Sequence, residues 1–141
     1  MTAMTEAKPI LPMVTELNKP FWDGCREGRL QVQKCTACGT LRYPAAPVCP
    51  ECLDSGSTWQ TLSGRGTVFS FIVFQRTYNP AWAAKVPYNV SMVELDEGVM
   101  MFSNVVGIPN EQVAVGLKVE VRFERLTDEI HIPVFVPWAS A

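Results

Sequence analysis

Hydrophobic positions near the start of the chain recur with the period of an amphipathic helix. The apolar stripe, with steps of three and four residues, consists of Val14, Leu17, Phe21 and Cys25. Pro20 falls inside this stripe, and proline is tolerated in the first turn of a helix but not in its interior. The sequence therefore predicts a turn followed by a helix that starts near Pro20 and ends close to Gly28.

The second half of the chain shows the period of β-strands. In residues 118–124, Val119, Val121 and Phe123 alternate with charged side chains, which is typical of a half-buried strand. Residues 67–74 and 90–95 are apolar on both faces. About five such strands fit between the Gly, Pro and Asn turn signals, and they predict a small closed or nearly closed barrel.

These patterns divide the chain into three parts. Residues 1–28 form an N-terminal arm and helical segment, residues 29–60 a cysteine-rich segment, and residues 61–141 the barrel. The middle part has few large aliphatic residues and cannot build a core of its own. The predicted fold class is therefore mainly β with a short helical start.

Four of the five cysteines form two CxxC pairs in KCTACGT and VCPECLD. A gap of two residues lets both thiolates of one turn point at the same ion, and two such turns complete a tetrahedron around zinc. Gly39 follows the first pair and can take a positive φ, whereas Leu53 has the matching place after the second pair. The predicted metal ligands are Cys35, Cys38, Cys49 and Cys52.

This site is expected to be structural. Four protein ligands leave no open coordination position, so one zinc ion per chain should hold the fold and activate no water. A pair of redox-active CxxC motifs is the alternative, but it requires a thioredoxin-like βαβ setting that the surrounding sequence does not offer.

Three further sets of potentially reactive side chains are each explained without a catalytic role. Cys25 lies on the apolar helical stripe and is expected to be a small buried hydrophobe. His131 alternates with isoleucines in a late strand, with no neighbouring cysteine or serine in sequence to act as a nucleophile. The carboxylates of ELDEG, residues 94–98, fit a solvated hairpin tip better than an acid–base pair. We expect no catalytic residue in this chain.

Composition and charge limit the partners. Hydrophobic residues make up 48% of the chain and charged residues 18%, so it can bury a core. The formal net charge of −2 disfavours binding of a polyanion by bulk charge. No apolar run is long enough to span a membrane and the start does not read as a signal peptide, so we expect a cytoplasmic protein.

A local excess of positive charge surrounds the predicted metal site. The excess arises from Arg26, Arg29, Lys34 and Arg42 against Glu27. Because four thiolates and one Zn²⁺ carry a charge of −2, we expect partial compensation between the two. Attraction of nucleotide phosphates is the alternative.

The order of several motifs resembles a known family. The motifs are PFWDGCREGRL, KCTACGTLRYP, VCPEC, GRGTVFSF, YNVSMVELDEG and IPVFVP. From about residue 14 to the end, the chain is similar to the acyl-CoA-associated family of zinc-ribbon and OB-fold proteins, long known as a domain of unknown function. The resemblance implies N-terminal helices, a rubredoxin-like zinc ribbon and a C-terminal five-stranded OB-fold barrel.

The resemblance also implies a function. Members of this family usually act as the small subunit beside a thiolase-superfamily enzyme, including sterol-carrier-protein-type thiolases and the side-chain aldolases of steroid degradation. This chain is then expected to be an accessory, non-catalytic subunit in a hetero-oligomer that makes or breaks a carbon–carbon bond next to a CoA thioester. The catalytic residues would lie in the larger partner.

Two aromatic segments are candidates for contact with a ligand or partner. Residues 75–88 form a long connection in which cations flank aromatic rings, and the candidate CoA-binding or acyl-binding residues are Arg76, Tyr78, Trp82 and Lys85. Packing under the loop and contact with a partner suit these residues equally well. Phe21 and Trp22 lie on a helix outside the barrel, and we expect them to contact a partner or the ribbon.

Two other functions compete with the accessory role. A stand-alone binder of single-stranded nucleic acid is the main alternative, because ribbons and OB barrels both bind single strands, but residues 61–141 carry six basic and eight acidic side chains rather than a basic excess. A free-standing CoA-ester hydrolase or transferase would need a nucleophile with a nearby base, which the sequence does not show.

Overall fold

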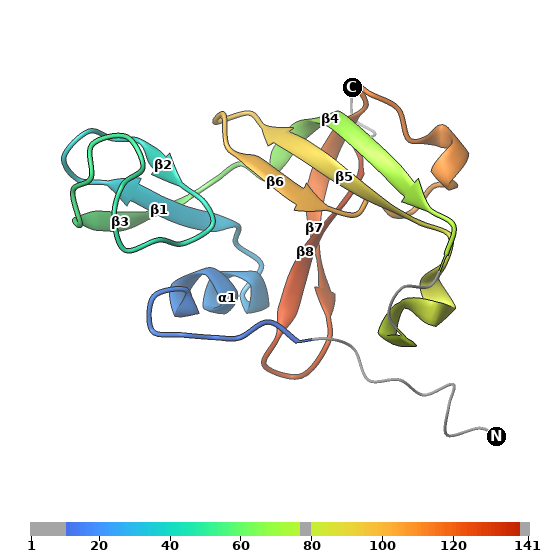
Figure 1. The fold of residues 1–141 in the computed structure, drawn as a ribbon, viewed down its shortest axis with the longest axis horizontal. Helices are drawn as coiled ribbons and strands as arrows, with labels where there is room; N and C mark the ends of the chain where they lie inside the picture. The colour runs from blue at the N-terminus through green and yellow to red at the C-terminus, as the bar shows by residue number, and fades with distance from the viewer. Residues whose placement is uncertain (1–10, 77–79, 139–141) are drawn as a thin grey trace.

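The computed structural model describes residues 11–76 and 80–138, with the side chains of residues 81–83 excepted. A three-stranded sheet lies at one end of the molecule and a curled five-stranded sheet at the other, with the helix α1 (Lys19–Arg26) lying below and between them (Figure 1). The mainly β fold class is confirmed.

Helix α1 begins where the sequence predicts. Pro20 lies in its first turn, and Gly28 follows its end with a φ of 84°. Its buried face contains Phe21, Gly24 and Cys25, and the helix contacts β1 of the small sheet and β7 and β8 of the large one. The helix therefore fills the angle between the two sheets.

The small sheet carries both cysteine pairs on its connections. It consists of β1 (Gln31–Cys35), β2 (Leu41–Arg42) and β3 (Ser57–Thr61), all antiparallel, in the order β2-β1-β3. The first CxxC turn runs from the end of β1 towards β2, and the second lies in the long loop between β2 and β3. This arrangement is that of a zinc ribbon.

The large sheet has five antiparallel strands in the order β6-β5-β4-β7-β8. The strands are β4 (Arg65–Phe74), β5 (Tyr88–Leu95), β6 (Met100–Ser103), β7 (Lys118–Arg125) and β8 (His131–Pro137). Two short 3₁₀ helices, η2 (Pro80–Lys85) and η3 (Asn110–Gln112), lie in the connections. The structure shortens the connection predicted over residues 75–88, because part of it is helical and Tyr88 already belongs to β5.

The sheet curls until its two edges meet. Val105, just after β6, forms a parallel bridge with Phe135 of β8. Two backbone hydrogen bonds close the junction, from the Val106 N–H to the Phe135 oxygen at 2.8 Å and from the Phe135 N–H to the Asn104 oxygen at 2.9 Å. The curled sheet is therefore consistent with an OB-fold barrel, and the side chain of Phe135 is fully buried.

One hydrophobic core joins helix, ribbon and barrel. Its buried members are Phe21, Cys25, Leu30, Val32, Leu62, Val68, Val93, Leu95, Val99, Met101, Val105, Val113, Val119 and Phe135. At the junction of the two sheets, the Leu62 N–H donates to the Leu30 oxygen at 2.7 Å. The boundaries at residues 28/29 and 60/61 stay predictions.

Among the described residues, no helix is long and apolar enough to cross a membrane.

Candidate functional site

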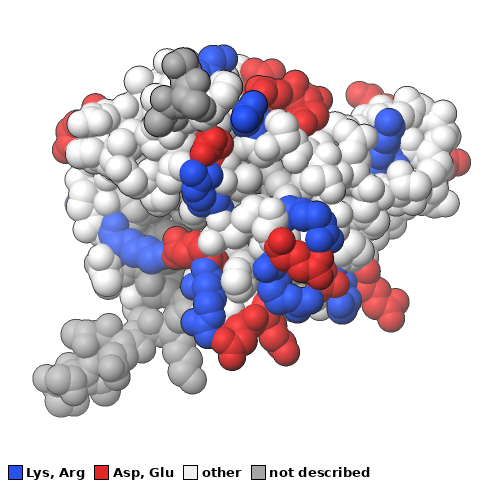
Figure 2. Space-filling view, turned by 180° about the vertical axis from the view of Figure 1, so that it is seen from behind, with Lys and Arg blue, Asp and Glu red and all other residues white. Residues whose placement is uncertain are grey.

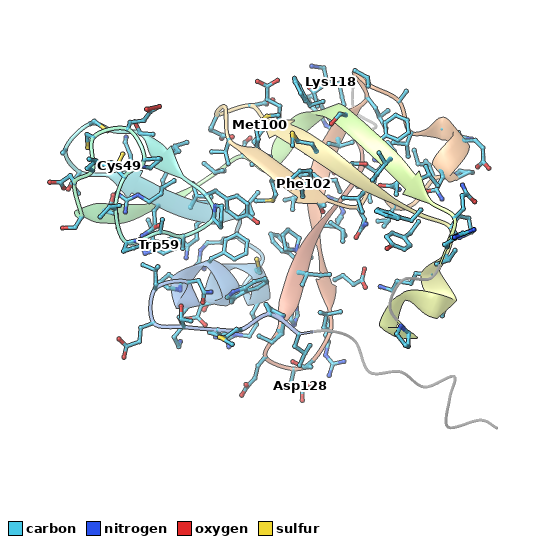
Figure 3. All side chains as sticks on the ribbon, viewed as in Figure 1. Cys49, Trp59, Met100, Phe102, Lys118 and Asp128 are labelled. Atoms are coloured by element: carbon cyan, nitrogen blue, oxygen red, sulfur yellow. The ribbon has the colours of Figure 1, made fainter. Side chains whose placement is uncertain are left out.

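The four cysteines of the two CxxC pairs converge at the tip of the ribbon. Their sulfur atoms all lie within 4.8 Å of one another. The Sγ atoms of Cys35 and Cys52 are 3.5 Å apart, and those of Cys38 and Cys49 are 3.6 Å apart. Figure 3 shows Cys49 in the ribbon, at the end of the molecule away from the barrel. These four residues are positioned to bind a metal.

The backbone of the two turns follows one pattern. The Gly39 N–H donates to the Cys35 oxygen at 3.0 Å, and the Leu53 N–H donates to the Cys49 oxygen at 2.9 Å. Both donors have a positive φ, 80° at Gly39 and 67° at Leu53. The sequence prediction for Gly39 is therefore confirmed, and Leu53 adopts the same left-handed conformation despite its side chain.

Backbone donors prepare two of the thiols for metal binding. The N–H of Cys38 is the main reason that the pKa of Cys35 falls to about 6, and the N–H of Cys52 lowers the pKa of Cys49. Both side chains are buried, whereas Cys38 and Cys52 are exposed. Thiolate is the form that binds metal, so these hydrogen bonds favour the ligand state.

The donor set fits zinc. Four sulfurs at the usual Zn–S distance of about 2.3 Å lie about 3.8 Å apart in a tetrahedron, which is close to the distances between these sulfurs. Disulfides are excluded as the explanation, because an S–S bond is about 2.05 Å long and all five cysteines are free. The four thiolates would hold zinc as a closed, structural site.

The fifth cysteine plays no part in this cluster. Cys25 is fully buried in α1, and this burial raises the pKa of its thiol to about 12. The expectation of a small buried hydrophobe is confirmed.

The carboxylate run between β5 and β6 lies at a turn. Asp96 and Gly98 are exposed, and Gly98 has a φ of 96°. Glu97 accepts a hydrogen bond from the Ser63 N–H at 2.8 Å. The interpretation as a solvated hairpin tip is confirmed. His131 begins β8 opposite Arg125 and is half-buried, and its expected non-catalytic role stays a prediction.

Two of the four candidate CoA-binding residues can be placed in full. Arg76 and Lys85 are both exposed, and the Lys85 Nζ lies 3.3 Å from the Glu124 Oε1. Trp82 belongs to η2, but its side chain, like all of Tyr78, lies outside the described residues. The CoA-binding role of this set stays a prediction.

A cavity of about 510 Å³ lies beside Lys85. Its wall combines the Lys85–Glu124 pair with apolar side chains and three asparagines, and the residues are Lys85, Pro87, Tyr88, Asn89, Asn104, Val105, Val106, Gly107, Ile108, Pro109, Asn110 and Glu124. Mostly apolar walls with a few polar groups are typical of ligand pockets. Lys85 and Tyr88 of the candidate segment thus line this cavity.

Phe21 and Trp22 differ in their surroundings. Phe21 is only 5% exposed and packs on Tyr43 of the ribbon, with ring centroids 5.5 Å apart. Trp22 is half-buried, and its indole N–H is buried without a hydrogen-bond partner among the described residues. Contact with the ribbon is thus observed for Phe21, and contact of either residue with a partner protein stays a prediction.

The barrel has an exposed apolar face that the sequence pattern does not single out. Phe69, Ile72 and Phe102 are 56%, 56% and 67% exposed. Strand pairing places Ile72 opposite Val90, and Phe102 opposite Met92, so these four lie on one face of β4-β5-β6. Figure 3 shows Phe102 and Met100 on the same strand of this sheet. The sequence shows that residues 67–74 and 90–95 are apolar on both faces. It does not show which of the two faces stays exposed to solvent.

Several charged residues on other parts of the surface form ion pairs. Arg122 lies 2.7 Å from Glu120, and Arg125 pairs with Asp128. On the face seen in Figure 2, positive and negative side chains are interspersed over the described residues. This distribution is unlike the basic stripe expected of a nucleic-acid-binding barrel.

Comparison with known proteins identifies both sheets. Residues 22–58 match the family model described as the rubredoxin-like zinc ribbon domain of ChsH2, and residues 59–124 match that of its C-terminal OB-fold domain. A solved structure described as "Ltp2-ChsH2(DUF35) aldolase" aligns with a TM-score of 0.80 and 34% identity, over 89% of this chain and 98% of that one.

Curated relatives include subunits of CoA-thioester enzymes. The chain is 35% identical to the "Probable enoyl-CoA hydratase alpha subunit" of Thermomonospora curvata, over 96% of this chain and 43% of the relative. It is 27% identical to the "Benzoylsuccinyl-CoA thiolase subunit BbsA" of Thauera aromatica, over 75% of this chain and 77% of the relative. The chain thus spans less than half the length of the hydratase subunit.

Proposed function

Because the chain belongs to the DUF35 family of ChsH2-like zinc-ribbon and OB-fold proteins, we propose that it is an accessory subunit of a thiolase-like complex acting on CoA thioesters. In this role it supports a larger subunit that carries the catalytic residues. The reaction is the cleavage or formation of a carbon–carbon bond, by thiolysis or retro-aldol chemistry, and steroid side chains are a candidate substrate class.

The observation that carries this proposal is the near-complete structural match to a chain of the aldolase named above. Two features of the described residues support it. The cysteine cluster has the closed donor set of a structural metal and leaves no position for substrate. The face with Ile72 and Phe102 exposes large apolar side chains, and patches of this kind mark interaction surfaces.

A test of this role begins with the tagged chain expressed in its native host. The chain is purified by affinity, co-eluting proteins are identified by mass spectrometry, and the zinc-to-protein ratio is measured on the same sample. We expect a thiolase-like protein in a near-stoichiometric ratio and one zinc per chain. Recovery of the chain alone, or with nucleic acid that dissociates at high salt, would contradict the proposal and favour a stand-alone binding module.

We further propose that residues 75–88 contact the CoA thioester within the complex. The support is the cavity beside Lys85, whose apolar walls and asparagine amides suit the pantetheine arm of CoA. Arg76 precedes η2 and Lys85 ends it, and both are exposed cations that could receive phosphate, while Tyr78 and Trp82 between them in the sequence are the candidates for contact with the acyl group.

A second candidate function is a subunit of a CoA-thioester hydratase. The observation in its favour is the 35% identity to a hydratase alpha subunit over almost the whole of this chain. The two candidates differ in the activity of the partner, so an assay of the protein that co-elutes in the same affinity purification distinguishes them.

A further inference from the structure

Arg42 is a buried cation without an acidic partner. It lies on the two-residue strand β2 and is only 2% exposed. The ion pairs formed by the described residues do not include it. Burial of an unpaired charge is costly, and it persists only where opposite charge or hydrogen bonds compensate. The position of Arg42 therefore requires an explanation.

The hydrogen bonds of Arg42 compensate only part of this cost. Its guanidinium donates to the Ala46 oxygen at 3.0 Å and to the Gly56 oxygen at 3.3 Å. Its Nε is buried and has no hydrogen-bond partner among the described residues. Two neutral carbonyls satisfy part of the donor set and leave the positive charge without a counter-ion.

These two carbonyls belong to the segments that hold the cysteine turns. Ala46 lies between β2 and the second CxxC turn, and Gly56 lies between that turn and β3. The Gly56 oxygen also accepts the N–H of Thr36, inside the first turn, at 3.2 Å. Arg42 therefore holds the chain on both sides of the second turn, and through the shared Gly56 oxygen it is also linked to the first turn.

Gln33 completes this buried layer. It pairs with Arg42 across β1 and β2 and is 3% exposed. Its side chain accepts the Ala46 N–H at 2.8 Å and donates to the Ser57 hydroxyl at 3.2 Å. Gln33 and Arg42 therefore fix the same two segments from neighbouring strands.

We propose that Arg42 is the buried counter-charge of the tetrathiolate zinc site and fixes the spacing of its two CxxC turns. This inference rests on the proposed zinc site. Four thiolates and one Zn²⁺ carry a charge of −2, and the link to Arg42 is the Gly56 oxygen, which accepts from both Arg42 and Thr36, the residue after Cys35. Arg42 is a positioning residue, because it acts on the metal through the field it supplies and the backbone it holds.

Two substitutions separate the charge of Arg42 from its hydrogen bonds. Arg42→Lys keeps the charge and loses the planar donor geometry, whereas Arg42→Gln keeps one donor group and loses the charge. Removal of groups around a metal site typically weakens metal affinity by about 10- to 100-fold. We expect Arg42→Gln to weaken zinc affinity by at least about tenfold, and Arg42→Lys to weaken it by less.

The matched control is Lys34→Gln. Lys34 is an exposed cation on β1, one position from Gln33, so this change removes the same charge from the ribbon without touching the buried layer. Its zinc affinity should stay within about twofold of the wild-type value, because exposed charges are screened by solvent.

The measurement uses the full chain. Zinc affinity is determined by competition with a colorimetric chelator, and the absorption spectrum of the Co²⁺-substituted protein reports whether four thiolates still bind.

Failure of the wild-type chain to bind zinc would overturn the zinc site itself. If the wild-type chain binds zinc and Arg42→Gln binds it equally well, or Arg42→Lys is the weaker of the two, the counter-charge role is wrong. If Arg42→Gln is insoluble, Arg42→Lys decides the question: because this variant keeps the charge, a zinc affinity more than about 100-fold below the wild-type value would overturn the counter-charge role.

Discussion

Leu53 occupies the same backbone conformation in the second CxxC turn that Gly39 occupies in the first, with φ values of 67° and 80°. A left-handed conformation costs a residue with a Cβ about 1–2 kcal/mol, and the Leu53 side chain is 73% exposed and recovers little of this by packing. Glycine at this position would remove that cost, but fixing a glycine costs about 0.5–1 kcal/mol of chain entropy, so part of the stabilisation would be lost.

Leu53→Gly should therefore raise the free energy of unfolding of the zinc-loaded chain by about 0.5–1 kcal/mol. Chemical denaturation in the presence of zinc measures this. The reciprocal control, Gly39→Leu, should be destabilising. Destabilisation by Leu53→Gly of a similar size to that of Gly39→Leu would show that the conformation at residue 53 is not strained.

Loss of one metal ligand should unfold the ribbon. Structural zinc binding contributes about 10–16 kcal/mol in zinc-finger peptides, compared with about 5–15 kcal/mol for the stability of a whole domain. Cys35→Ser or Cys52→Ser is expected to release zinc and to give insoluble protein. Cys25→Ala is the control, because this buried thiol lies outside the cluster, and it should keep one zinc per chain. Soluble Cys→Ser chains that still bind the partner would contradict the structural role of the metal.

Asn89 should stabilise the closure of the barrel. It is 2% exposed, and its amide accepts the Val105 N–H at 2.8 Å and donates to the Val105 oxygen at 2.8 Å. Asn89→Ala leaves both Val105 groups buried without these partners, at a cost of about 1–3 kcal/mol for each unsatisfied group. We expect the thermal unfolding midpoint to fall by several degrees.

The control for Asn89 is Ser103→Ala. Ser103 donates one side-chain hydrogen bond, to the Pro133 oxygen at 2.9 Å, and lies at the same edge of the barrel. The thermal unfolding midpoint of Ser103→Ala should fall much less than that of Asn89→Ala. Equal midpoints for Asn89→Ala and the wild-type chain would show that the Val105 junction does not depend on this side chain.

Substitutions in residues 75–88 should weaken ligand binding or assembly of the complex. Lys85→Ala and Trp82→Ala are expected to weaken CoA-thioester affinity or complex formation, measured by calorimetry and by size-exclusion chromatography of the complex. The control is Lys118→Ala on β7, an exposed lysine hydrogen-bonded to Thr67 and absent from the cavity wall. If both variants behave like Lys118→Ala in both assays, these residues are ordinary surface.

The local features of this fold could be predicted from the sequence, and the long-range ones could not. The ligand set and the start of α1 depend on residues close together in the chain, so spacing and Pro20 were sufficient. Barrel closure joins Val105 to Phe135 and needs Asn89 from a third segment, which no periodicity encodes. The sequence counts Arg42 among the cations near the metal site but does not indicate its burial, because this burial depends on contacts with Ala46 and Gly56 in the loop between β2 and β3.

The central claim is that this chain supports catalysis by a larger subunit and performs none alone. The most direct test measures turnover of a CoA thioester by the purified chain, by the thiolase-like protein that co-purifies with it, and by the two together. The account predicts no turnover by the chain alone and the highest rate for the stoichiometric complex. Turnover by the isolated chain, or a partner whose rate and stability do not change when the chain is added, would contradict it.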